Sequence, residues 1–212
     1  MKIRHNFLFF IFIAVYFSVI WWWLRVILTG GLPWIDAVTR GFTEEIKDSI
    51  VYVLFRWLTV FGSKPFMVPF VIGMMIVIWC IYRAWRPAFT YGLVILGTYI
   101  VNKSSKLFIA RDRPETSVLL DANGYSFPSG HAMVSFVCYG LLAYFTGKMV
   151  RSPVFSMIVY CYFIIFAFLI GFSRFILNVH YPTDIVAGWG LGGIILYGTI
   201  ALCNRNAANK RW

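Results

Sequence analysis

Residues 178–203 read NVHYPTDIVAGWGLGGIILYGTIALC, a short polar turn followed at once by an apolar run. The run from 185 to 203 is long enough to cross the hydrocarbon core of a bilayer as one helix. Pro182 suits the first turn of such a helix, because the N–H groups there have no partner within the helix. His180 and Asp184 are four residues apart, so at a helix start they lie over one another. The stretch predicts a membrane helix that begins at a polar site.

The histidine and the aspartate have a chemical use if the Asp184 carboxylate holds the proton on one nitrogen of the His180 ring. The other ring nitrogen is then free to attack as a nucleophile. A histidine and an aspartate at this spacing are also common as an ordinary hydrogen bond at a helix start. The residues that gather around the pair therefore decide between the two interpretations.

The composition is that of a membrane protein. Of the 212 residues, 60% are hydrophobic and 13% are charged, well outside the usual fractions of a soluble domain. The chain is rich in Trp and Tyr, which favour membrane interfaces. A formal net charge of +11 is compatible with nucleic acid, anionic lipid or an anionic substrate. The sequence contains no basic tail and no soluble nucleic-acid-binding module, so we predict no nucleic-acid partner.

The apolar runs predict an all-α bundle of six transmembrane helices. We expect the first run to be retained, because its Trp-rich end lacks the small residues of a signal-peptide cleavage site. The six runs cover residues 7–28, 65–82, 87–101, 131–146, 153–172 and 185–203. No linker or internal repeat divides the sequence, and we expect one domain over residues 1–212.

Residues 32–57, between the first two runs, have a different pattern. Apolar side chains recur every three or four residues with acids such as Asp36 between them, which predicts an amphipathic helical stripe. The apolar part at 50–61 is too short to cross a bilayer and includes Arg56. We therefore expect an interfacial helical segment that lies along the membrane surface or packs against the bundle.

The charges in the short loops predict the orientation. With six spans, the loops that contain Arg83 and Lys148 lie on the same side as both termini, and the positive-inside tendency makes that side cytoplasmic. The eight acids then lie on the other side: Asp36, Glu44, Glu45, Asp48, Asp112, Glu115, Asp121 and Asp184. We expect a multi-pass plasma-membrane protein with cytoplasmic termini and a polar site at the extracytoplasmic face.

Cations gather at that predicted face. Lys106, Arg113 and Arg174 lie in segments that meet there if the six spans form, and each can donate hydrogen bonds to phosphate oxygens. Charged residues inside a bilayer are costly, so cations grouped at a membrane edge beside two of the three histidines indicate a bound anion.

The turn at 128–131 supports the same prediction. Ser129 and Gly130 precede a helical run, where unpaired backbone N–H groups and the helix dipole favour an anion. Ser129 also suits the N-cap position. If His180 attacks phosphorus, the departing oxygen needs a proton, and we assign His131 as the general acid. His131 can then accept a proton from the water that cleaves the phosphohistidine.

Together these residues resemble the three signature motifs of the type 2 phosphatidic acid phosphatase superfamily, the lipid phosphate phosphatases. The motifs are intact and in order: Lys106-x6-Arg113-Pro114, Pro128-Ser129-Gly130-His131 and Ser173-Arg174-x5-His180-x3-Asp184. The resemblance implies roles in phosphate binding for Lys106, Arg113, Ser129, Gly130 and Arg174. It also implies protonation of the leaving group by His131, and a phosphohistidine at His180 supported by Asp184. It implies no metal or other cofactor, and the four cysteines lack metal-ligand spacing.

The sequence therefore predicts a metal-independent membrane phosphatase whose partners are a lipid phosphate substrate and the surrounding membrane lipids. Undecaprenyl diphosphate and phosphatidylglycerophosphate are favoured over phosphatidic acid, because the small chain with short loops resembles the bacterial members of the superfamily. Transfer of the phosphate to another acceptor is an alternative, and a non-catalytic transporter of lipid phosphates is another. The intact His131, His180 and Asp184 favour an enzyme, since binding alone needs no nucleophile. No obligate protein partner is indicated.

Overall fold

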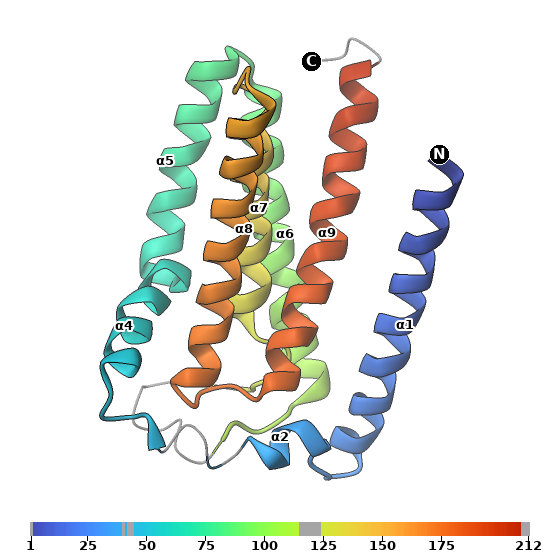
Figure 1. Ribbon diagram of the computed structural model, residues 1–212, viewed down its shortest axis with the longest axis vertical. Helices are drawn as coiled ribbons and strands as arrows, with labels where there is room; N and C mark the ends of the chain where they lie inside the picture. The colour runs from blue at the N-terminus through green and yellow to red at the C-terminus, as the bar shows by residue number, and fades with distance from the viewer. Residues whose placement is uncertain (1, 40, 42–44, 115–123, 209–212) are drawn as a thin grey trace.

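The structure is a computed structural model that describes residues 2–39, 41, 45–114 and 124–208. Every regular element in these ranges is a helix (Figure 1), so the all-α prediction is confirmed. In chain order the elements are α1 (Lys2–Leu28), α2 (Trp34–Val38), α4 (Ile50–Leu58), the 3-10 helix η1 (Thr59–Gly62), α5 (Lys64–Tyr82), α6 (Trp85–Ile109), α7 (Gly130–Gly147), α8 (Pro153–Ile176) and α9 (Pro182–Ala208). Glu44, Glu115 and Asp121 lie outside the described residues.

Helix α7 forms the centre of the bundle. Most of its side chains are buried, because α6, α8 and α9 all pack against it. Helix α5 packs against α6. Glycines bring α9 close to α7. A Cβ at Gly188 would lie 2.7 Å from the Ser129 carbonyl oxygen, and one at Gly192 would lie 2.9 Å from that of Met133. Both distances are too short for a larger residue without a shift of backbone, so these glycines set the α7–α9 spacing.

Helix α1 lies at the edge of the bundle, beside α9 (Figure 1). The Tyr16 hydroxyl donates a hydrogen bond to the Ala187 carbonyl oxygen at 2.8 Å, and the absence of a side chain at Gly190 leaves room for the Tyr16 ring. Much of the remaining surface of α1 is exposed and apolar, as at Val15 and Trp21. This exposure is expected of a helix that faces lipid.

Three of the described helices are long and apolar enough to cross a membrane: α5, α8 and α9 over Pro182–Arg205. The apolar helical segments Ile13–Leu28 and Ile50–Gly62 are shorter. Helix α6 carries polar side chains in its last turns, including Lys106, and α7 has His131 in its first turn, next to the Ser129 N-cap. The prediction that the chain crosses the membrane six times therefore stays a prediction.

The helix ends define two poles of the bundle. The end of α6, the start of α7, the α8–α9 loop and α2 lie at one pole, whereas α1 starts and α9 ends at the other (Figure 1). Helices α6 and α8 run further than the sequence predicts, to Ile109 and Ile176. Lys106 and Arg174 therefore project from the last turns of long helices and not from loops.

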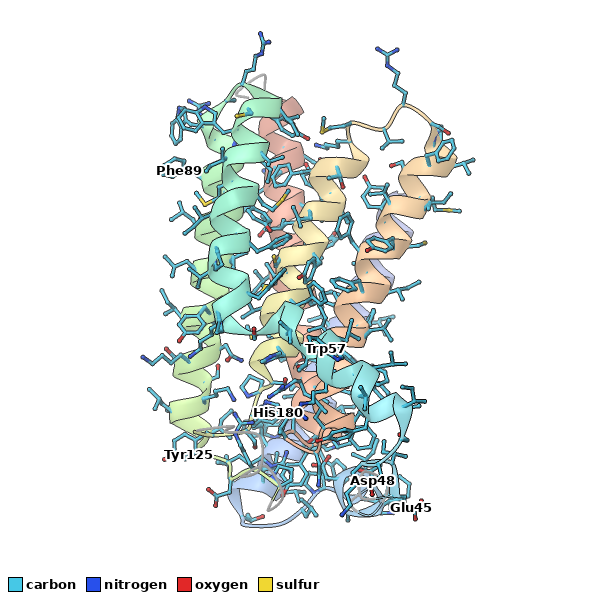
Figure 2. The ribbon with its side chains drawn as sticks, turned by 90° about the vertical axis from the view of Figure 1, so that its left-hand side faces the viewer. Glu45, Asp48, Trp57, Phe89, Tyr125 and His180 are labelled. Atoms are coloured by element: carbon cyan, nitrogen blue, oxygen red, sulfur yellow. The ribbon has the colours of Figure 1, made fainter. Side chains whose placement is uncertain are left out.

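The described residues of 32–57 do not form one continuous amphipathic helix. They contain the short α2 and the start of α4, which packs against α8 with Phe55 5.8 Å from Phe172 between ring centroids. Asp36, one of the acids in this stretch, is fully buried. The physical reason is that donors from elsewhere in the chain satisfy both of its oxygens. Glu45 and Asp48 lie at the same pole as His180, and Phe89 lies at the other (Figure 2).

Candidate active site

His180 lies in the loop between α8 and α9, inside the pole of the bundle that also carries Tyr125 (Figure 2). The chain turns there at Asn178, whose φ of 51° lies in the left-handed region that asparagine tolerates. The Arg174 carbonyl oxygen then accepts hydrogen bonds from the N–H groups of Val179 and His180, at 3.1 and 3.2 Å. The loop is thus fixed by its own backbone, and the imidazole is only 3% exposed.

The two nitrogens of the His180 ring face different partners. Nδ1 lies 3.3 Å from Asp184 Oδ2, and Nε2 lies 3.2 Å from Arg113 Nη1. A guanidinium has only donors, so Nε2 must be the acceptor and the proton must sit on Nδ1, where the carboxylate accepts it. The structure brings His180 and Asp184 together as their spacing predicts, and it leaves the lone pair of Nε2 directed at the arginine that we assign to phosphate binding.

The other oxygen of Asp184 binds an arginine that the sequence analysis missed. Arg111 Nη1 donates to Asp184 Oδ1 at 2.6 Å, and Arg111 Nη2 donates to Asp36 Oδ2 at 2.7 Å. Thr183 closes the group: its hydroxyl donates to Asp36 Oδ2 at 2.6 Å and accepts from Arg111 Nη1 at 2.8 Å. Its N–H also donates to Asp36 Oδ1 at 3.1 Å. All four side chains are buried.

The three cations assigned to phosphate binding hold the loops around His180. Lys106 donates to the carbonyl oxygens of Tyr125 and Ser126, the latter at 3.0 Å. Arg113 donates through Nε to Gly124 and through Nη1 to Val179, both carbonyl oxygens at 2.8 Å. Arg174 Nη1 donates to Thr59 Oγ1 at 2.9 Å, and its buried Nε has no hydrogen-bond partner among the described residues. The structure thus gathers cations from the ends of α6 and α8 and from the loop after α6.

His131 lies in the first turn of α7, next to the Ser129 N-cap. The Ser129 hydroxyl accepts from the Ala132 N–H at 3.4 Å, and the Ser129 N–H donates to the Asp184 carbonyl oxygen at 2.9 Å. This second bond ties the start of α7 to the start of α9. His131 is within electrostatic range of Arg174, His180, Arg113 and Lys106. All eight predicted site residues therefore meet at one pole of the bundle.

Gly130 is held by a second residue that the sequence analysis did not assign to the site. A Cβ at Gly130 would lie 2.9 Å from the Asn102 side-chain oxygen, so α6 approaches the turn closely. The Asn102 amide donates to the Pro128 carbonyl oxygen at 3.1 Å. Asn102 is buried on α6, and its amide fixes the conformation of the turn that precedes His131.

Burial and positive charge decide the protonation of His180. Burial holds the pKa of His180 well below its usual value, and Lys106, Arg113, Arg174 and Arg111 lower it further. The imidazole is therefore neutral at neutral pH. Four cations therefore act on His180, and one of them, Arg111, pairs with the carboxylates of Asp36 and Asp184. The surplus of positive charge suits a phosphate dianion.

Burial raises the pKa of Asp36, while the hydrogen bonds from Thr183 and Arg111 act in the opposite direction. The contact with a guanidinium, which stays charged, favours the ionised form of this carboxylate. Arg111 therefore shares its charge between two carboxylates.

Within the described ranges, no three His, Cys, Asp or Glu side chains are grouped as they would be around a metal ion. Cys138 and Cys203 are buried, Cys80 and Cys161 are exposed, and all four are free thiols.

The fold and the site together define a class: an α-helical membrane protein with a buried, neutral histidine amid cations at one pole of its bundle. The PAP2 superfamily pattern matches residues 87–208, which is more than half of the chain and includes every motif residue. The chain belongs to the PAP2 superfamily.

Two curated relatives are similar over about three quarters of the chain. The Phosphatidylglycerophosphatase B of Bacillus subtilis (strain 168) is 29% identical over 169 residues, which cover 78% of this chain and 73% of the relative. The Undecaprenyl-diphosphatase of Sulfolobus acidocaldarius is 28% identical over 175 residues, which cover 76% of this chain and 79% of the relative. Both relatives carry the names of phosphatases.

Solved structures share the fold. A transmembrane PAP2-type phosphatidylglycerolphosphate phosphatase from Bacillus subtilis superposes with a TM-score of 0.77 and 22% identity, over 89% of this chain and 96% of that one. Aquifex aeolicus LpxE superposes with a TM-score of 0.56 and 22% identity, over 76% of this chain and 92% of that one. These likenesses are of fold, and the long apolar helices of this chain indicate a membrane protein.

Proposed function

We propose that this protein hydrolyses a phosphate or diphosphate ester of a membrane lipid through a phosphohistidine intermediate on His180. One observation carries the proposal: the imidazole is held between Asp184 at Nδ1 and Arg113 at Nε2, so a nucleophilic lone pair points at an anion-binding group. A binding protein or transporter has no need of a histidine in this tautomer.

In the first step, the lone pair of His180 Nε2 forms a bond to phosphorus while the bond from phosphorus to the leaving oxygen breaks. That oxygen is the ester oxygen of a monophosphate or the bridging oxygen of a diphosphate. Lys106, Arg113 and Arg174 offset the charge on the phosphoryl oxygens. His131 donates its proton to the departing oxygen. Asp184 stabilises the imidazolium, because its carboxylate accepts the Nδ1–H bond throughout.

In the second step, a water molecule attacks phosphorus and His131 accepts its proton. The bond between phosphorus and Nε2 breaks, its electron pair returns to the imidazole, and inorganic phosphate leaves. Gly130 offers its N–H at the start of α7 to the phosphate, where the helix dipole favours an anion. Ser129 supports this site as the N-cap of α7, while its own N–H donates to the Asp184 carbonyl oxygen.

For the substrate we favour phosphatidylglycerophosphate or undecaprenyl diphosphate. The names of the two relatives support this choice. A site at the pole of the bundle suits a lipid whose headgroup enters while its chains stay in the membrane.

We further propose that residues 1–212 form one domain with six spans, α1 and α5 to α9, in the plasma membrane. The α5–α6 and α7–α8 connections, with Arg83 and Lys148, lie at the pole opposite His180, where α1 starts and α9 ends. This grouping supports cytoplasmic termini and an extracytoplasmic site, since positive loops favour the cytoplasm.

The test is phosphate release from a panel of lipid phosphates by protein purified in detergent. Phosphatidylglycerophosphate, undecaprenyl diphosphate and phosphatidic acid form the panel, and His180→Ala is the control for contaminating phosphatases. We expect release by the wild type only, unaffected by EDTA. A phosphorylated acceptor in place of free phosphate would indicate a transferase, and no turnover of any substrate would refute the proposal.

A further inference from the structure

Asp36 stands apart from the residues that define the family. It lies on α2, outside the matched region 87–208, and it is fully buried. Its carboxylate accepts three hydrogen bonds, from the N–H and the hydroxyl of Thr183 and from Arg111. A buried carboxylate costs free energy unless it is paired. Asp36 is thus a fully paired charge from the first part of the chain, built into the base of the candidate active site.

The contacts of Asp36 lead to the imidazole in two steps. Arg111 uses one nitrogen for Asp36 and the other for Asp184, at 2.7 and 2.6 Å. Asp184 then presents its second oxygen to His180 Nδ1. Because a guanidinium is planar and rigid, the position of Asp36 sets the plane in which Arg111 meets Asp184. That plane decides where the carboxylate oxygen meets the imidazole.

Resting on the proposed phosphatase function, we infer that Asp36 is a positioning residue, which acts through Arg111 and Asp184 to set the orientation and basicity of His180. It anchors α2 to the start of α9. It also pairs with Arg111, so that the positive charge of Arg111 is shared between Asp36 and Asp184. The first part of the chain thereby contributes to the chemistry as well as to the membrane anchor.

A positioning role for Asp36 predicts opposite shifts in the protonation of His180 when Asp36 and Arg111 are each neutralised. The charged or titratable groups that face His180 are Lys106 on α6, Arg111 and Arg113 after it, His131 on α7, Arg174 on α8 and Asp184 on α9. Removal of the negative charge at Asp36 leaves Arg111 wholly to Asp184, so protonation of His180 moves to lower pH. Removal of the positive charge at Arg111 has the opposite effect. A purely structural role would instead loosen the site in both variants, and hydration would move the titration upward in both.

The experiment compares Asp36→Asn with Arg111→Gln in full-length protein purified in detergent. Asp112→Asn is the matched control, because it makes the same chemical change at an exposed carboxylate beside Arg111. The His180 titration is followed by NMR of ¹⁵N-histidine-labelled protein, with the signal assigned by its loss in His180→Ala. Steady-state phosphate release gives kcat and KM for each variant.

We expect Asp36→Asn to lower kcat by about 10- to 100-fold, as for other partners that orient a reactive group, while KM stays close to the wild-type value. The His180 titration should move down in Asp36→Asn, up in Arg111→Gln and not at all in Asp112→Asn. A folded Asp36→Asn variant with wild-type kcat, or with an upward titration shift, would overturn the inference.

Two further readouts keep the outcome decisive. If thermal unfolding shows that Asp36→Asn does not fold, Thr183→Val removes the hydroxyl between Asp36 and Arg111 but keeps both charges, and an unchanged kcat there would overturn the inference. If the wild type releases no phosphate from any lipid, the proposed function fails, and the direction of the NMR shifts still decides whether Asp36 sets the basicity of His180.

Discussion

Asp184→Asn should inactivate the enzyme by exchanging the tautomer of His180. Arg111 donates to Oδ1, so the asparagine must place its oxygen there and its NH₂ group at the position of Oδ2. That NH₂ group then faces His180 Nδ1 and the Tyr181 N–H, both of which Oδ2 accepts from in the wild type. Nδ1 becomes an acceptor and the proton moves to Nε2. The nucleophilic lone pair is lost although the side chains keep their shape.

The magnitude follows from this exchange. The same substitution in a serine-protease triad lowers kcat about 10⁴-fold by forcing the wrong tautomer, which corresponds to about 5.5 kcal/mol in the activation free energy. We expect a loss of this order in phosphate release, with KM changed far less, because the cations that we assign to phosphate binding remain. ¹⁵N NMR should show His180 changing from the Nδ1–H to the Nε2–H tautomer.

Two outcomes would refute the reasoning. One is a folded Asp184→Asn variant that works within about tenfold of the wild-type rate. The other is a large loss of rate with the Nδ1–H tautomer unchanged, which would point to a role for the charge alone. Asp112→Asn, at an exposed carboxylate, is the control and should behave as the wild type does.

Three other predictions test separate parts of the site. His131→Ala should strongly slow the hydrolysis of an alkyl phosphate. It should slow an aryl phosphate with an acidic leaving group much less, since that group departs without a proton. Equal losses of rate for the two substrates in phosphate-release assays would contradict the general-acid role. Because the pKa of His180 is lowered, its neutral form persists below pH 6.5. After correction for the titration of the substrate, kcat/KM should therefore fall only at lower pH. A fall in kcat/KM with its midpoint at about pH 6.5, the usual pKa of histidine, would contradict the burial argument. Gly188→Ala should destabilise the protein by about 1–3 kcal/mol, because the new Cβ would be too close to the Ser129 carbonyl oxygen. Gly73→Ala should not, because a Cβ at Gly73 has no neighbour within 4 Å. Similar unfolding midpoints for the two variants in detergent would refute the packing role of Gly188.

The helices could be predicted, and the motif residues of the candidate site proposed, because their signals are local. Apolar runs indicate helices, and Pro182 marks the start of α9 in both sequence and structure. The ends of α6 and α8 were placed too early, because hydropathy falls where polar side chains such as Lys106 and Arg174 begin. A backbone that continues its own hydrogen bonds keeps these turns helical despite their polarity.

The ion pair between Asp36 and Arg111 was beyond sequence reasoning. Its members are 75 residues apart, and each has a plausible local explanation: one acid of an amphipathic stripe, and one arginine beside the motif residue Arg113. A fully paired buried charge looks the same in sequence as a solvated one. The only available signal was the second arginine in a loop already assigned to anion binding, and that signal does not identify its partner.

The order of the motifs along the chain follows from where charges can lie in a membrane. A cation or a reactive imidazole is costly inside a bilayer, so each motif must lie at a helix end, and all of them must lie at the same pole to surround one phosphate. Lys106 is near the end of α6, His131 is in the first turn of α7, Arg174 is near the end of α8 and Asp184 is near the start of α9. This alternation of ends and starts requires antiparallel neighbours: α7 leaves the site, α8 returns to it, and the turn between them at Lys148 carries no part of the chemistry. An insertion that shifted one of these helices by half a turn would rotate its motif residue out of the site while leaving the hydropathy profile unchanged.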